Sequence, residues 1–417
     1  MANHRERFPR LYLWGAIAAF ASVVVVNQPT QAQTYKVLYS FSIAPGGGSA
    51  SGVIEDPEGN LYGTFNTPGI SRACNGGGCG VVYKLEPSGK YVQLHIFDGL
   101  HKYGRQTNSG VIRDAQGNLY GEALSGIHDS GIVYKLSPAG KETVLNSFNR
   151  STTGAYPVGG LIRDAQQNLY GTNYIGGVYG GGTVFKLSNT RKETVLYSFT
   201  YGAGGDEPPG GVIRDAKGNL YGTTQYGGDL YSCGQGVGCG VVFKLDNTGK
   251  ETVLYSFTGG ADGATPEASV IQDAQGNLYG TTYYGGSTKC SDGIGVGCGV
   301  VFKLDASGAE TVLYSFCSVS ECADGANPVA GLVKDAQGNL YGTTNLGGSS
   351  GFPPCDFYHV GCGVVFKLDP SGSETVLYSF CSVQQCTDGG RPVTPLIQDA
   401  QGNLYGTAYS VLFELTP

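Results

Sequence analysis

The sequence predicts an all-β protein, a seven-bladed β-propeller in which each blade contains four strands. Three observations predict this fold: one tetrapeptide recurs seven times, each copy lies in a unit of four short strands, and the chain ends carry complementary strand types. The tetrapeptide is Asn-Leu-Tyr-Gly, and its copies begin at Asn60, Asn118, Asn168, Asn219, Asn277, Asn339 and Asn403. Their spacing of 50 to 64 residues is too long for one coil of a β-helix and suits a four-stranded unit.

The unit around Asn277 shows the order of the predicted elements. Strand a (269–272) is followed by a tight Asp-x-x-Gly turn, strand b (277–282), a variable loop, strand c (300–304), a second Asp-x-x-Gly turn and strand d (311–316). Asp favours the first position of such a turn, and Gly supplies the positive φ that closes it. The c strands carry apolar residues on both faces, which is typical of a sheet covered on both sides by neighbouring blades.

The two ends of the chain predict that the ring is closed. The first strand expected after residue 32 is a d strand (37–41), and the last is a c strand (411–415). The final unit therefore lacks only strand d, and we expect the N-terminal strand to complete it. Closure leaves no open repeat end, whereas an open array would have no use for complementary ends.

Chain direction sorts the connections onto two faces. The a–b and c–d turns are short and uniform, and the face they form is called the turn face. The b–c and d–a loops contain nearly all the variation in length, and they form the loop face. Loops held by a rigid frame are where binding is usually found.

Residues 1–32 have the features of a secretory signal. A basic start is followed by an uncharged, mostly apolar run (11–26) and by small residues that suit cleavage after Ala32. An uncleaved membrane anchor is the alternative, although 16 residues are short for a span of about 20 residues. We therefore expect one propeller domain (33–417) in a protein that is secreted, periplasmic or at the cell surface, with no membrane span after cleavage.

Twelve cysteines form six close pairs along the sequence. An even number in an exported protein predicts disulfides, and local pairing is the simplest arrangement. Zinc is the alternative, but no pair has CxxC spacing. The expected bridges are Cys74–Cys79, Cys233–Cys239, Cys290–Cys298, Cys317–Cys322, Cys355–Cys362 and Cys381–Cys386.

The net charge argues against a nucleic-acid partner. The whole chain carries a formal charge of −7 with no basic block, whereas nucleic-acid-binding domains present basic patches. We expect a monomer.

Taken together, the motifs resemble the GloVer tandem repeat of exported bacterial proteins. The resemblance rests on Asp-Gly-x-x-Pro, Gly-x-Asn-Leu-Tyr-Gly-Thr-Thr, Gly-x-Val-Phe-Lys-Leu and Val-Leu-Tyr-Ser-Phe, and it covers about residues 35–417. It implies an exported β-propeller and no established activity. The second unit departs from the pattern, because Gly-Glu-Ala replaces Gly-Thr-Thr at 121–123.

Four aspartates of the d–a loops are the first candidates for ligand binding. They are Asp206, Asp262, Asp324 and Asp388, and the last three lie in Asp-Gly-x-x-Pro. At the rim of the channel, their carboxylates would suit sugar hydroxyls or Ca²⁺, the one ion that the sequence leaves open; we otherwise expect no cofactor. The alternative interpretation is structural, because Asp, Gly and Pro together also build a turn.

Tyrosines on the loop face are the second set of candidates. They suit stacking on sugar rings or contact with a protein, or they pack over the glycine-rich loops. These residues are Tyr226, Tyr231, Tyr283, Tyr284 and Tyr358.

The sequence therefore favours a non-catalytic, exported propeller that binds a glycan or a cell-surface protein through its loop face. No catalytic residue stands out, because the histidines share no spacing from unit to unit. An extracellular lyase or hydrolase that uses carboxylates at the channel rim is the first alternative. A purely structural surface protein is the second.

Overall fold

The computed structural model describes Met1 and residues 33–41, 50–67, 79–97, 107, 109–124, 130–234, 236–290, 296–348 and 361–417. The predicted signal segment, Cys74, Cys355, Tyr358 and the side chain of Cys79 lie outside the described residues. The chain separates into two units, Met1–Ala32 and Gln33–Pro417, and the description that follows concerns the second.

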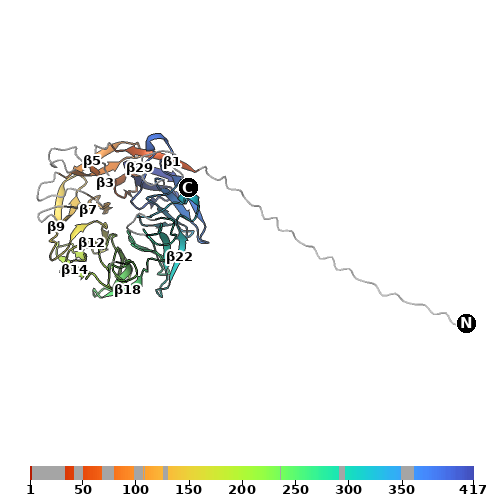
Figure 1. Cartoon of the computed structure of the whole chain (residues 1–417). Coiled ribbons are helices and arrows are strands. Elements are labelled where there is room, and N and C mark those ends of the chain that lie inside the picture. The colour runs from red at the N-terminus through yellow and green to blue at the C-terminus, as the bar shows by residue number, and fades with distance from the viewer. Residues whose placement is uncertain are drawn as a thin grey trace. The chain divides into compact units, whose positions relative to one another are not determined.

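In its described residues, the second unit is a ring of seven antiparallel sheets (Figure 1). Blade 1 contains β2 (Ile54–Glu55), β3 (Leu61–Thr67), β4 (Cys79–Leu85) and β5 (Tyr91–Ile96). Blade 2 contains β6 (Ile112–Arg113), β7 (Leu119–Ala123), β8 (Ile132–Leu136) and β9 (Glu142–Ser147). Blade 3 contains β10 (Ala155–Pro157), β11 (Ile162–Arg163), β12 (Leu169–Ile175), β13 (Thr183–Leu187) and β14 (Glu193–Ser198).

The remaining blades follow the same order of strands. Blade 4 contains β15 (Ile213–Arg214), β16 (Leu220–Thr224), β17 (Val241–Leu245) and β18 (Glu251–Ser256). Blade 5 contains β19 (Ile271–Gln272), β20 (Leu278–Thr282), β21 (Val300–Leu304) and β22 (Glu310–Ser315). Blade 6 contains β23 (Val333–Lys334), β24 (Leu340–Thr343), β25 (Val364–Leu368) and β26 (Glu374–Ser379). Blade 7 contains β27 (Ile397–Gln398), β28 (Leu404–Ala408), β29 (Val411–Thr416) and the N-terminal β1 (Thr34–Ser40).

The N-terminal strand closes the ring, which confirms the prediction from the chain ends. Strand β1 pairs antiparallel with β29, from Thr34 opposite Thr416 to Ser40 opposite Val411. In Figure 1, β1 at the red end of the colour scale lies beside β29 at the blue end.

Two details differ from the sequence prediction. Each a strand is only two residues long, because the preceding residues lie at the crowded axis and contact neighbouring blades. A Cβ placed on Gly210, for example, would lie 2.2 Å from the backbone nitrogen of Ser269 in the next blade. The other difference is β10, an additional strand that pairs with β12 and gives blade 3 a fifth strand.

Aromatic contacts join every blade to the next. The Phe that follows each d strand packs against the central aromatic residue of the following c strand, with ring centroids 4.8 to 5.4 Å apart. The pairs are Phe41–Tyr83, Phe97–Tyr134, Phe148–Phe185, Phe199–Phe243, Phe257–Phe302, Phe316–Phe366 and Phe380–Phe413. Tilted and edge-on geometries are favourable for aromatic pairs, and the c-strand rings are fully buried. We call this circle of contacts the aromatic seam.

The glycine of Asn-Leu-Tyr-Gly makes room for the seam. Gly280 lies opposite Phe302 in the paired b and c strands of blade 5. A Cβ on Gly280 would lie 2.6 Å from Cζ of the Phe302 ring, closer than carbon atoms pack in protein interiors. The repeat therefore requires the smallest residue here for a packing reason.

The rest of the motif fastens the a–b turn. In blade 5, the Asp273 carboxylate accepts hydrogen bonds from the Asn277 backbone N–H and side chain (2.9 and 2.8 Å) and from the Tyr279 hydroxyl (2.9 Å). Burial opposes ionisation of Asp273, but these hydrogen bonds outweigh it and lower its pKa to about 2. The same Asp–Asn–Tyr arrangement recurs in all seven blades, so the motif holds the turn face together.

A threonine hydroxyl of strand b also bridges adjacent blades. Thr281, for example, donates to the Ala330 carbonyl of the next blade at 3.1 Å. In blade 2 this position is Glu122, which is fully buried and accepts from the Gly160 N–H at 3.1 Å. Burial is the main cause that raises the pKa of Glu122 to about 8, although the Gly160 hydrogen bond opposes the shift.

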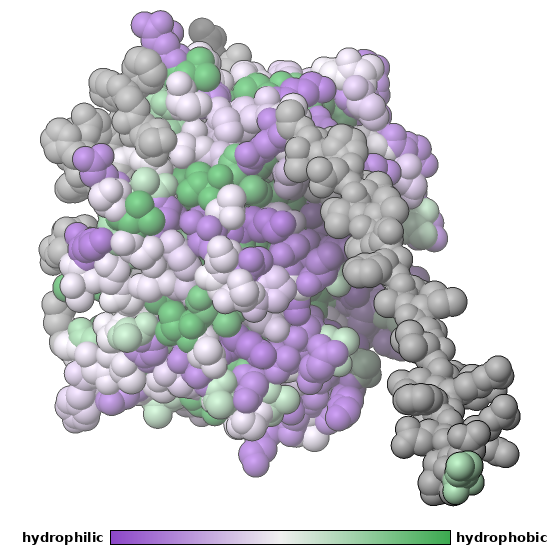
Figure 2. All heavy atoms as spheres, turned by 90° about the vertical axis from the view of Figure 1, so that its right-hand side faces the viewer, coloured by the Kyte–Doolittle hydropathy of each residue, from purple (hydrophilic) through white to green (hydrophobic). Residues whose placement is uncertain are grey.

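The surface has no broad apolar area on the side of the ring seen in Figure 2, where small hydrophobic patches are separated by hydrophilic residues. Within the described residues, no helix has the length and apolar character that crossing a membrane requires.

Removal of residues 33–41 tests the closure of the ring. A chain that begins at residue 42 loses β1 and the Phe41–Tyr83 contact, so we expect its free energy of unfolding to fall by at least about 3 kcal/mol. Urea denaturation measures this difference, with the chain that begins at Gln33 as the control. An unchanged unfolding midpoint would contradict the closure.

Asp273→Asn tests the fastening of the turn. The substitution can place an amide NH₂ where Oδ2 of Asp273 accepts from the Asn277 side chain and the Tyr279 hydroxyl. Because an NH₂ group cannot accept these hydrogen bonds, we expect a loss of about 1–3 kcal/mol in the free energy of unfolding. The folded-state pKa is depressed, so the contribution is present above pH about 4 and is lost as the pH falls toward about 2. The matched control is Asp305→Asn, in an exposed c–d turn, and thermal denaturation from pH 7 to pH 2 measures both variants. Equal losses in the two would count against a special role for the motif.

Glu122→Gln tests the buried carboxyl between blades 2 and 3. Because the folded-state pKa is raised, the protonated carboxyl stabilises the fold fully below pH about 4.5, and this contribution is lost as the pH rises through about 8. We expect the parent protein to lose up to about 4 kcal/mol over this interval relative to the Gln variant. Chemical denaturation at several pH values checks this, with the exposed Glu58→Gln as the control. Parallel pH profiles for the parent and Glu122→Gln would contradict the assignment.

Candidate functional site

The centre of the ring is a channel that is almost without ionisable groups. Segments that lead into the a strands of all seven blades line a cavity of about 470 Å³, and their residues are mainly Gly, Val, Ile and Ala. Glu267 of blade 5 is the one ionisable residue among the described residues that line it. The channel wall is therefore mainly apolar, and Glu267 is the point at which an ionisable side chain meets it.

A chain of hydrogen bonds crosses three blades at the loop-face mouth of the channel. The Tyr174 hydroxyl donates to Oε1 of Gln225, and Nε2 of Gln225 donates to Oε1 of Glu267 at 2.8 Å. Tyr174 and Gln225 stand at the ends of the b strands of blades 3 and 4. With Val158, Pro209, Val329 and Val393 they line a cavity of about 360 Å³, here called the mouth cavity.

Acidic charge is concentrated beside this chain. Burial is the main cause that raises the pKa of Glu267 to about 7; the Gln225 hydrogen bond opposes the shift and the nearby Glu207 carboxylate adds to it. Burial raises the pKa of the Tyr226 hydroxyl, and the nearby Glu207 and Glu267 carboxylates add to this shift. The mouth cavity thus combines hydrogen-bonding groups with apolar walls, the usual composition of a small-ligand site.

Three of the predicted aspartates fasten the outer edge of their blades. The Asp324 carboxylate accepts hydrogen bonds from the Tyr314 hydroxyl (2.7 Å) and the Ser318 N–H (2.8 Å). Asp388 bonds Tyr378 and Ser382 in the same way, and Asp262 bonds Tyr255 and Thr258. These tyrosines belong to d strands, so the expected position at the channel rim is wrong for all three. Their role in ligand binding stays a prediction.

Asp206 occupies a different position from the other three. Its backbone pairs with Tyr226, as Ala264 pairs with Tyr284 and Ala326 with Leu346. The residue equivalent to Asp262 is Gly204, where a Cβ would lie 3.0 Å from the Tyr197 hydroxyl. Burial, and then the neighbouring Glu207, raise the pKa of Asp206 to about 7. The sequence analysis grouped Asp206 with the others because prolines also follow it closely, at Pro208 and Pro209.

The predicted tyrosines differ in exposure. Tyr231 is 91% exposed at the tip of the b–c loop of blade 4. Tyr226, Tyr283 and Tyr284 are half-buried at the ends of b strands, and the rings of Tyr283 and Tyr284 meet edge-on with centroids 4.6 Å apart. The charges of Glu207 and Glu267 act on Tyr226, which therefore lies near the mouth cavity. Tyr283 follows the b strand of blade 5 at the position that Gln225 has in blade 4.

Local disulfides tie the loops, as the spacing of the cysteines predicts. The described bridges are Cys233–Cys239, Cys290–Cys298, Cys317–Cys322 and Cys381–Cys386. Cys362 is also disulfide-bonded. The four sulfurs of the second and third bridges lie within 4.8 Å of one another, but each is in an S–S bond. The bridges are typical of a protein that folds in an oxidising, extracytoplasmic compartment.

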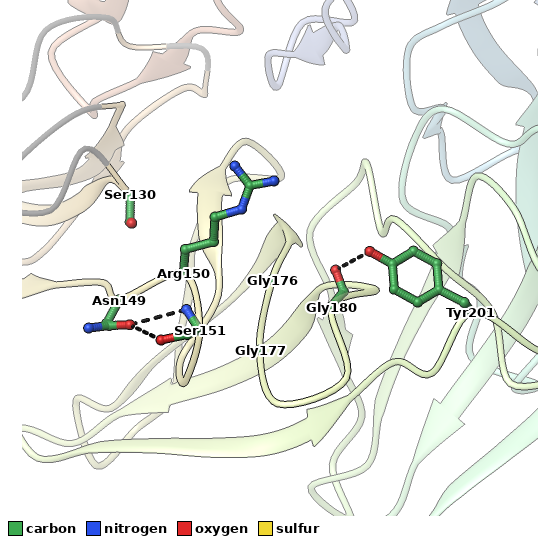
Figure 3. Close-up of a pocket in the computed structure, with 8 residues that line it drawn as sticks. All are labelled: Ser130, Asn149, Arg150, Ser151, Gly176, Gly177, Gly180 and Tyr201. Carbon is green, nitrogen blue, oxygen red and sulfur yellow. Dashed lines mark hydrogen bonds between the residues drawn. The ribbon is translucent and has the colours of Figure 1, made fainter.

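A second cavity of about 520 Å³ lies on the loop face between blades 2 and 3 (Figure 3). The Asn149 side chain accepts from the backbone and hydroxyl of Ser151 at 3.1 and 2.7 Å. Across the cavity, the Tyr201 hydroxyl donates to the Gly180 carbonyl at 2.8 Å. The Arg150 side chain extends from the same loop as Asn149 and Ser151, on the side of the cavity opposite Tyr201 (Figure 3). We call this space the Arg150 cavity.

Sequence reasoning missed Arg150, Tyr201, Gln225 and Glu267. None belongs to a repeated motif, and each gains neighbours from other loops or from other blades. Aligning the seven units on the b-strand glycine would have placed Tyr174 and Gln225 at equivalent positions, since each lies three residues after that glycine. No periodic signal marks the other three.

Several solved structures share the propeller fold. A streptogramin B lyase matches with a TM-score of 0.56 and 11% identity, over 92% of this chain and 97% of the lyase. The extracellular domain of a protein described as a hybrid two-component system of B. thetaiotaomicron matches with a TM-score of 0.53 and 14% identity, over 92% of this chain and 41% of that one. The WD40 β-propeller domain of Doa1 matches with a TM-score of 0.52 and 8% identity, over 92% and 97%. At these identities the likeness establishes the fold alone.

No curated protein sequence matches the chain significantly. A family model does match, and its two matches, to residues 66–293 and 232–412, together include most of the propeller and most of the repeated motifs. The chain therefore belongs to the Gloeobacter/Verrucomicrobia repeat family.

Proposed function

We propose that the protein is an exported, non-catalytic propeller that binds carbohydrate at the mouth cavity of its loop face. The hydrogen-bonded chain from Tyr174 through Gln225 to Glu267 carries the proposal, because it presents several polar groups beside apolar side chains. Sugars have the same mixed character, with hydroxyl groups around apolar ring faces. Tyr226 and Tyr283 add aromatic surface of the kind that stacks on sugar rings.

Export is supported by two independent features. Residues 1–32 have the pattern of a cleavable secretory signal, and disulfides tie the loops of blades 4 to 6. Disulfides persist outside the cytoplasm and hold the binding face in shape there.

A catalytic role is the second candidate, and one observation favours it. The pKa of Glu267, at about 7, would suit a general acid, and Glu207 is a neighbouring carboxylate. Against catalysis, Oε1 of Glu267 already accepts a hydrogen bond from Gln225. The recurring aspartates of the d–a loops are also engaged in structural turns. Asp262, Asp324 and Asp388 each accept a hydrogen bond from a tyrosine hydroxyl of a d strand.

A glycan array followed by calorimetry tests the proposal. We expect the parent protein to bind a defined set of glycans, and Gln225→Ala to bind them about tenfold more weakly because it loses two hydrogen bonds at the site. The matched control is Gln275→Ala, an exposed glutamine on the turn face, which should bind like the parent. Failure of the parent to bind any glycan, or equal weakening by both variants, would refute the proposal. Release of reducing ends from a bound glycan, abolished by Glu267→Gln, would establish the enzyme instead.

A further inference from the structure

The Arg150 cavity contains a positive charge that the protein does not neutralise. Arg150 is exposed, and the described residues provide no carboxylate within ion-pair distance of its guanidinium. The guanidinium carbon lies 5.9 Å from the centroid of the Tyr156 ring, and the Arg150 charge also acts on Tyr201. In a chain with a formal charge of −7, an arginine that extends into a cavity without a counter-charge is a candidate for an anionic ligand.

The surroundings of Arg150 are closely packed and suit a sugar. The Arg150 carbonyl accepts a hydrogen bond from the Gly177 N–H at 2.8 Å, and a Cβ on Gly176 would lie 2.3 Å from the same carbonyl. The loops of blades 2 and 3 are therefore closely packed below the side chain. Tyr179 and Tyr201 are 62% and 54% exposed nearby, and they provide aromatic surface, while Asn149 and Ser151 provide polar groups at the cavity wall.

The same combination recurs at blade 7, and this second occurrence is an independent observation. Arg391 and Tyr409 line a cavity of about 230 Å³ beside the Cys381–Cys386 bridge. Arg391 is exposed and has no ion pair with the described residues, and Tyr409 is 49% exposed. The Arg391 N–H donates to the Cys362 carbonyl at 2.7 Å, which fixes the backbone from which the side chain extends.

We propose that the loop face binds an acidic polysaccharide, with Arg150 and Arg391 each recognising a uronate carboxylate while the adjacent tyrosines contact the sugar ring. This inference rests on the proposed function and names the class of glycan. The planar guanidinium can form two parallel hydrogen bonds with a carboxylate, which makes arginine the favoured residue for such contacts. A polymer with a carboxylate on every sugar could occupy both cavities, so that two weak contacts reinforce each other.

The negative net charge of the protein does not prevent this binding. Exposed charges are largely screened beyond about 8 Å at physiological ionic strength, so a carboxylate within a cavity interacts mainly with the charges close to it and little with the net charge of the chain. Glu267 belongs to blade 5 and lines neither cavity, whereas Asp206 and Glu207 lie closer: their charges act on Tyr201 at the wall of the Arg150 cavity, and the Arg150 charge opposes them there. The polymer is therefore expected to contact the loop face at the two arginine cavities.

Calorimetry with matched ligands tests the proposal. The probe is an oligogalacturonate, and its fully methyl-esterified form is the neutral counterpart with the same sugar backbone. We expect the ester to bind at least about tenfold more weakly than the acid, and Arg150→Gln or Arg391→Gln to weaken binding of the acid by a similar factor. Lys217→Gln, which removes an exposed positive charge from the turn face, is the control and should leave binding unchanged.

Several outcomes would overturn the inference. Equal binding of the acid and the ester would exclude recognition of the carboxylate, and so would no effect of either arginine substitution. Equal weakening by Lys217→Gln would show non-specific attraction of a polyanion, and stronger arginine-dependent binding of dextran sulfate would reassign the site to sulfate esters. If the protein binds neutral glycans on the array but not oligogalacturonate, this inference fails and the proposed function stands. If it binds no glycan, both fail.

Discussion

The packing of one aromatic ring against the next blade is the constraint on which the rest of the structure depends. Each d strand ends in a Phe that contacts the c-strand aromatic of the following blade, and the circle is completed by Phe41 from the N-terminal strand. The c-strand ring fits only because the b strand opposite it has a glycine. Every blade therefore shares its core with both neighbours, and a single blade taken alone would leave apolar surface exposed.

This division of roles explains why the two faces of the ring differ. The Asp–Asn–Tyr bonds and the glycine keep the turn face uniform from blade to blade. The loop face is released from that constraint, and its segments are held instead by backbone hydrogen bonds and disulfides. Rigid loops lose little conformational entropy when a ligand binds, so a frame with short-range bridges suits recognition of an extended polymer.

The architecture could be predicted from the sequence because the same motif and strand pattern recur in all seven units. Asn-Leu-Tyr-Gly counts the blades, and the strand types at the two ends predict the pairing of β1 with β29. Local disulfides follow from close cysteine pairs. Each of these signals involves neighbours along the chain or an exact recurrence of the same residues.

The candidate site could be predicted only in part, because it arises from contacts between loops that share no motif. The sequence located the loop face and some of its tyrosines. It misplaced Asp262, Asp324 and Asp388, since a carboxylate that caps a turn and one that faces a channel have the same local sequence. The sequence grouped Asp206 with them, although its pairing with Tyr226 places it two residues further along the repeat, at the position of Ala264. Arg150 and Glu267 matter because of residues in other loops that lie beside them, and no pattern in the neighbouring sequence predicts those contacts.

Hydrogen–deuterium exchange with and without oligogalacturonate tests the central claim most directly, because it reports on both faces in one experiment. The account predicts slower exchange on binding in the loops around Arg150, Gly176 and Arg391, with no change in the a–b turns that contain Asp273 and its equivalents. Protection of the a–b turns, with the loops unaffected, would contradict the assignment of structure to one face and recognition to the other.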